Sequence, residues 1–171
     1  EEADVAKDLA MEMICNTLFS NEKRLKELIV AEKSHMESIL NSRGNQVAAT
    51  RARCGFSKKA NISDLANGVR FYRFLVDLEE NFDDRKDEII SKLNKMCKTI
   101  FAKDRLIISS TGKTEVLNQA RRLVNDIRPL LSQEKLSFEG DNEFEVHPVK
   151  EALKDASQIQ YVAMAGDFVK S

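Results

Sequence analysis

The clearest chemical motif in this sequence is a Gly-Lys-Thr run. Gly112, Lys113 and Thr114 lie between an apolar run and a helical pattern, where nucleotide hydrolases carry their phosphate-binding loop. That loop also needs a glycine five positions before its Gly-Lys pair, because its backbone must wrap the phosphate. Ile107 occupies that position, inside the apolar run, so the pattern favours an ordinary turn over a nucleotide site.

The two histidines do not form a zinc motif. Zinc hydrolases that bind the metal on a helix place three residues between two histidines and a glutamate beside one of them, as HExxH or HxxEH. His35 and His147 are too distant in sequence for either motif. No Ser-His-Asp or Cys-His pattern stands out, although one assembled in space stays open. We therefore assign no catalytic, cofactor-binding or metal-binding residue and expect the chain alone to be inactive.

Two arginines lie in a helical stretch of small residues, QVAATRARC at residues 46–54. Arg51 and Arg53 could bind a carboxylate or a phosphate. Arginines on a helix more often form ion pairs or face solvent, so a ligand role is the weaker interpretation.

The three cysteines, Cys15, Cys54 and Cys97, are an odd number with no close pair. We expect these cysteines to be small buried hydrophobic residues of a protein in a reducing compartment. That compartment is either the cytoplasm or, if the chain belongs to a longer protein with a transit peptide, an organelle. The 27 basic and 28 acidic residues nearly cancel, to a formal net charge of −1. That balance predicts neither a nucleic-acid partner nor a membrane partner.

Apolar residues recur at helical spacing along most of the chain. The clearest stripe follows Phe82 on a helix that Asp83 or Asp84 can cap. Its members are Ile89, Ile90, Leu93, Met96, Cys97, Ile100 and Phe101. The other predicted helices run from Val5 to near Thr17, from Ser20 to a break at Gly44, over 46–54, from Asn61 or Ser63 to Phe82, and from Gly112 to Pro129.

Three short segments, 106–110, 136–138 and 158–162, are predicted strands. A strand cannot pair its own backbone groups. Its partners must come from the rest of a longer polypeptide or from self-association through unpaired strands. We therefore expect a piece of a longer protein, with an α+β fold. It is predicted to be a predominantly helical segment of a two-layer α/β domain, with few strands in a partial mixed sheet.

Several stretches, read together, carry a family resemblance. They are FSNEKRLKELIVAEKSHMES, NQVAATRARCGFS, ANGVRFYRFLVDLEENF, the helix that follows with RLIISSTG after it, and QIQYVAMAGDF. In order and spacing they resemble the second half of the insulinase and pitrilysin family of zinc peptidases, in its presequence-protease-like branch. The resemblance is strongest over 20–112 and resumes over 157–168. Met164 and Lys113 depart from the residues that are common in that branch.

The resemblance implies a parent with four related α/β domains that enclose unfolded peptides in a chamber. Residues 1–132 would be the latter part of the third, peptidase-associated domain, 133–156 a linker, and 157–171 the first strand of the fourth domain. The zinc cofactor and its HxxEH motif would belong to the parent's first domain, and none of the family's functional residues falls on this chain. The implied partners are the remaining domains of the parent, whose substrate is peptide. A free-standing helical interaction module and a metal-free homologue of the peptidase half are the alternatives.

Overall fold

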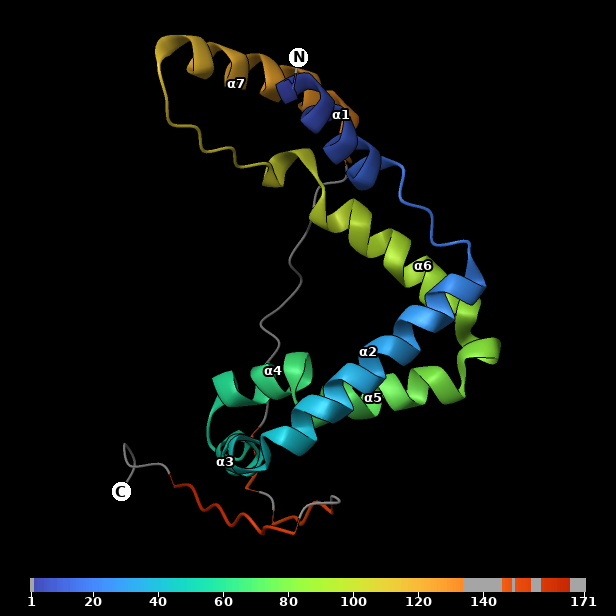
Figure 1. Ribbon diagram of the computed structural model, residues 1–171, viewed down its shortest axis with the longest axis vertical. Helices are drawn as coiled ribbons and strands as arrows, with labels where there is room; N and C mark the ends of the chain where they lie inside the picture. The colour runs from blue at the N-terminus through green and yellow to red at the C-terminus, as the bar shows by residue number, and fades with distance from the viewer. Residues whose placement is uncertain (1, 134–145, 149, 155–157, 167–171) are drawn as a thin grey trace. The chain divides into compact units, whose positions relative to one another are not determined.

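The helical periodicity of the sequence produces seven α-helices in the part of the chain that the structure describes. The computed structural model describes residues 2–133, 146–148, 150–154 and 158–166 (Figure 1). The α-helices are α1 (Glu2–Cys15), α2 (Glu22–Ser42), α3 (Gly44–Cys54), α4 (Lys58–Asn67), α5 (Val69–Glu80), α6 (Phe82–Ile100) and α7 (Thr114–Ile127). Two short 3₁₀ turns, η1 (Lys103–Arg105) and η2 (Arg128–Leu130), follow α6 and α7.

The prediction of an α+β fold with a partial mixed sheet is wrong for the described residues, which contain no β-strand. Their one isolated bridge joins Ala102 to Ser132 in parallel. Residues 106–110 form no strand, and Ile107 is 91% exposed. Residues 158–162 also form no strand, and Val162 is 97% exposed. An apolar run becomes a strand only where another backbone pairs with it, and periodicity cannot supply that partner. The predicted strand at 136–138 lies outside the described residues.

The chain divides into two compact units. Unit 1 comprises residues 1–22 and 86–139, and unit 2 comprises residues 23–85 and 140–171. One boundary lies at the start of α2 and another lies near the start of α6. The predicted domain limits at residues 132 and 156 follow the family resemblance and stay a prediction.

Unit 2 is built around α2 and α5, which lie side by side in Figure 1. Its core is apolar and combines residues of α2, α5 and the start of α6: Ile29, Met36, Val69, Leu75, Leu78 and Phe82. At the edge of this core Lys33 of α2 forms an ion pair with Glu79 of α5. The hydrogen bond to Glu79 raises the pKa of Lys33. The ammonium of Lys26 lies 5.4 Å from the centre of the Phe82 ring.

A glycine divides the helix that was predicted to run from Asn61 or Ser63 to Phe82. Gly68 separates α4 from α5. A Cβ added to Gly68 would lie 2.8 Å from the Cα of Asp64, so no other residue fits this close approach without a shift. At the other end of α4, Ser57 is the N-cap and accepts a hydrogen bond from the Ala60 backbone N–H at 3.3 Å.

Unit 1 contains α1, most of α6, and α7. Its buried apolar side chains are Met11, Ile89, Ala102 and Leu131. The stripe of α6 is covered only in part, since Ile89 is buried whereas Met96 and Ile100 are more than half exposed. The stripe of α7 has no buried residue. Large apolar faces of unit 1 are therefore open to solvent within the described residues.

Candidate functional site

The most completely formed polar site lies on α3, α4 and α5 of unit 2. Its centre is Asp64, which is 1% exposed. One carboxylate oxygen accepts hydrogen bonds from Arg51 Nη1 at 2.6 Å and from Arg70 Nε at 2.8 Å. The other oxygen accepts from the backbone N–H of Val69 at 3.0 Å, which caps α5. We call Arg51, Asn61, Asp64, Arg70 and Glu151 the Asp64 network.

Each of the two arginines also binds a second residue of this network. Arg70 Nη2 donates to the Asn61 backbone oxygen at 2.9 Å and also to the Asn61 side chain. Arg51 forms a bidentate pair with Glu151: its Nε donates to Oε1 at 2.5 Å and its Nη2 donates to Oε2 at 3.1 Å. Hydrogen bonding to Glu151 and the negative charge of Asp64 raise the pKa of Arg51 further above its already high value.

This arrangement is suited to fastening helices and offers little to a substrate. Among the described residues, every buried side-chain nitrogen and oxygen has a hydrogen-bond partner. The Asp64 carboxylate already accepts three donors and faces two guanidinium groups. Both carboxylate oxygens are therefore already occupied by donors of this chain, whereas a general acid or base must have an oxygen within hydrogen-bond reach of a substrate.

Arg51 and Arg53, paired in the sequence analysis, separate in the structure. Arg51 binds carboxylates that this same chain supplies. In the described part of the chain the hydrogen bonds of Arg53 are local. They go to the Ala49 backbone oxygen at 3.3 Å and to the Thr50 hydroxyl at 3.4 Å. Asp64 was not singled out by sequence reasoning. The sequence feature that could have pointed to Asp64 is its position one turn before Gly68. From there an aspartate can accept a hydrogen bond from the first turn of the helix that follows.

The other residues with candidate chemistry lie apart from this network. Gly112 and Lys113 are exposed, and Lys113 precedes α7 in an extended conformation. His35 is exposed on α2, and His147 is exposed beside the α3–α4 corner. In the described ranges, no group of three or more His, Cys, Asp and Glu side chains is placed to hold a metal ion.

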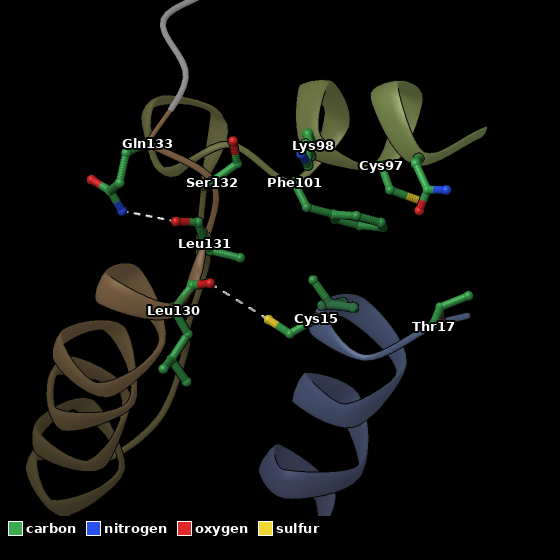
Figure 2. Close-up of a pocket in the computed structure, with 11 residues that line it drawn as sticks. Cys15, Thr17, Cys97, Lys98, Phe101, Leu130, Leu131, Ser132 and Gln133 are labelled. Carbon is green, nitrogen blue, oxygen red and sulfur yellow. Dashed lines mark hydrogen bonds between the residues drawn. The ribbon is translucent and has the colours of Figure 1, made fainter. Parts of the chain in front are cut away.

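Unit 1 contains an open cavity of about 570 Å³ between α1, α6 and the segment after η2 (Figure 2). Figure 2 shows Cys97 and Lys98 of α6, Phe101 directly after that helix, and Cys15 of α1 beside the cavity. The Cys15 thiol donates to the Leu130 backbone oxygen at 3.7 Å.

All three cysteines are free thiols. The prediction of buried cysteines is correct for Cys54 and wrong for the exposed Cys15, and Cys97 is only partly buried.

We expect the thiols to react at different rates with iodoacetamide at pH 8. Burial raises the pKa of Cys54, and the thiolate is the reacting species. Cys15 is exposed, so its alkylation should exceed that of Cys54 by on the order of tenfold or more. Peptide mass spectrometry over a time course measures both rates. In the urea-unfolded chain the rates should converge, and equal rates in the folded chain would contradict the burial of Cys54.

Comparison with known proteins finds a family that the first part of the chain matches. Residues 1–78, which extend from α1 into α5, match the peptidase-associated family that belongs to subfamily C of the M-16 peptidases. The matched segment, residues 1–78, covers less than half of the chain. This segment contains Arg51, Asp64 and Arg70 of the Asp64 network, whereas Glu151 lies beyond it.

Three curated proteins are similar to the chain that carries this peptidase-associated segment. Protein HypA of Clostridium perfringens is 24% identical over 163 residues, which are 95% of this chain and 16% of that protein. The mitochondrial presequence protease of Yarrowia lipolytica is 29% identical over 106 residues, 61% of this chain and 11% of that protein. Presequence protease 1, chloroplastic/mitochondrial, of Arabidopsis thaliana is 24% identical over 149 residues, 87% of this chain and 14% of that protein.

These similarities confirm the resemblance to the presequence-protease-like branch of the insulinase family. The chain spans 16% or less of the length of these three relatives. No solved structure matches the chain significantly. In the described residues no helix is both long and apolar enough to cross a membrane.

Proposed function

We propose that this chain is a non-catalytic structural segment of a zinc-dependent metalloendopeptidase that degrades peptides in an enclosed chamber. In this role it supports the half of the parent that closes over the substrate. The observation that carries the proposal is the match of residues 1–78 to the peptidase-associated family. The names of two relatives, both presequence proteases, support the peptidase assignment.

The Asp64 network supports a structural role in particular. It joins α3, α4 and α5 through a carboxylate that is 1% exposed and already has three donors. Breaking a buried charge cluster is costly, so such a cluster holds the elements around it in one arrangement. A rigid support is what a wall of a substrate chamber requires.

The exposed apolar faces of unit 1 support packing against the remaining domains of the parent. On α1, Val5, Leu9 and Met13 are each more than half exposed. On α7, Val116 is 44% exposed and Leu117 is 38% exposed. Contiguous apolar surface of this kind marks an interaction face. Self-association and a free-standing interaction module are the competing explanations for the same faces.

The zinc cofactor is proposed for the parent's first domain, where the HxxEH motif of this family would lie. This chain would contact peptide substrate only as part of the assembled parent. We propose a reducing compartment for the parent, and an organelle if a transit peptide precedes it. The names of two relatives, one mitochondrial and one chloroplastic/mitochondrial, support the organellar version.

The test is the coding sequence upstream of this chain, determined by extension of its transcript. The expected result is an HxxEH motif several hundred residues before Glu1. An upstream sequence without that motif would favour the metal-free homologue, and a start codon directly before this chain would favour the free-standing module.

A biochemical test uses the purified chain. It is incubated with zinc and with an unfolded peptide, and bound zinc and cleavage products are measured. We expect neither stoichiometric zinc nor cleavage, since the reacting groups are proposed to lie elsewhere in the parent. Stoichiometric zinc together with peptide cleavage would overturn the proposal.

A further inference from the structure

The corner between α3 and α4 holds a short segment that is distant in sequence, and the proposed function does not account for this contact. Gly55 forms the corner. A Cβ added to it would lie 2.6 Å from Pro148 Cα, 3.1 Å from Pro148 N and 3.2 Å from the His147 oxygen. The Gly55 backbone has φ of −72°, so conformation does not demand a glycine there. A glycine is required there because the backbone of Pro148 approaches too closely for a Cβ.

A second point of attachment follows three residues later. Glu151 forms the bidentate ion pair with Arg51, on the helix that ends at the Gly55 corner. Three residues of chain span at most about 10 Å. One short stretch of chain is therefore held at both ends on the same surface of unit 2.

Arg51 is also held by a partner other than Glu151. Its Nη1 is bound to Asp64, which is itself 1% exposed. The other two nitrogens of the guanidinium group, Nε and Nη2, bind Glu151. A guanidinium that is oriented in advance loses less conformational entropy when it binds a carboxylate. The Arg51 and Glu151 side chains are 12% and 22% exposed, so solvent screens this pair less than a pair on the open surface.

We propose that Arg51, Gly55, Pro148 and Glu151 form a latch. The α3–α4 corner is an interaction surface that fits a segment with a proline and, three residues later, a glutamate. In this chain residues 148 and 151 occupy that surface. The latch fixes the point at which the following residues leave unit 2, within the stretch that the sequence predicts to be a linker. The latch does not depend on the peptidase assignment, because it involves only contacts within this chain.

Limited digestion of the full folded chain with trypsin tests the latch. Lys154 lies just beyond it, and cleavage requires the segment to enter the protease active site. For each variant, the cleavage rate at Lys154 is divided by the rate in the same variant unfolded in urea. This ratio removes any effect of the substitution on trypsin specificity.

Two variants release the latch at different points. Glu151→Gln removes the charge that Arg51 binds, and Gly55→Ala adds a methyl group where Pro148 lies. We expect each to raise the normalised cleavage at Lys154 about tenfold. The matched control for the glycine is Gly166→Ala, because a Cβ there meets nothing within 4 Å. The control for the glutamate is Glu88→Gln, which removes an exposed ion pair with Lys92 on α6. Neither control should change the cleavage.

Cleavage at Lys33 of α2 separates release of the latch from unfolding of unit 2. A rise at Lys154 with no rise at Lys33 supports the latch. Unchanged cleavage at Lys154 in both Glu151→Gln and Gly55→Ala would overturn it. An equal rise at Lys33 and Lys154 in both variants would also overturn it, because the contact would then support unit 2 as a whole.

Discussion

Replacing Asp64 with alanine should lower the free energy of unfolding by about 3–5 kcal/mol, the cost of removing one partner from a buried ion pair. The substitution leaves Arg51, whose side chain is 12% exposed, and Arg70, 33% exposed, without their shared carboxylate. It also removes the acceptor that caps α5 at the Val69 N–H. The measurement is urea-induced unfolding followed by circular dichroism, fitted with a common slope for all variants.

Asp83→Ala is the matched control for this experiment. The Asp83 side chain is 82% exposed and pairs with Lys26 at 2.9 Å. An exposed pair of this kind contributes about 0–1 kcal/mol, so the variant should unfold near the midpoint of the original chain. Equal unfolding midpoints for the Asp64 and Asp83 variants would contradict the central position of Asp64 in unit 2.

Replacing Phe82 with alanine should cost about 3–5 kcal/mol of stability, in the range measured when a buried aromatic side chain is truncated. Phe82 is 2% exposed and begins α6, next to the core residues of α2 and α5. Its removal leaves a cavity and also removes the ring over which Lys26 lies. Thermal and urea unfolding of the purified variant measure the loss.

Phe74→Ala provides the comparison within the same residue type. Phe74 is 50% exposed on α5, so the truncation removes less buried surface and leaves a smaller cavity. We expect a loss of about 1 kcal/mol or less, as for other substitutions away from the core. A Phe74 variant as unstable as the Phe82 variant would show that the two rings were assigned to the wrong environments.

Most helices could be predicted because their signal is local. Apolar residues spaced for a helix place α1, α2, α6 and α7 close to their observed positions. The division of the stretch from Asn61 or Ser63 to Phe82 into α4 and α5 could not be predicted in the same way. It depends on Gly68, which lies against Asp64, and on the capping of Val69 by that carboxylate. Both are contacts that periodicity does not encode.

The strands at 106–110 and 158–162 were predicted from the same kind of pattern and are absent. Residues 106–110 have the apolar character of a buried strand, yet Ile107 is 91% exposed. A helix pairs its backbone groups within one segment, whereas a strand needs a second segment. A short apolar run therefore shows that a segment can be buried and does not show which partner covers it.

The sequence by itself determined the helical character of the chain, because each helix needs only its own residues, and the family resemblance, because that rests on the order of local stretches. Only the tertiary structure decided that Arg51 binds Asp64 and Glu151 while Arg53 stays local. The partners of Arg51 lie 13 and 100 residues away along the chain. Contacts over such separations form when packed helices bring the groups together, and the spacing of residue types carries no record of that packing.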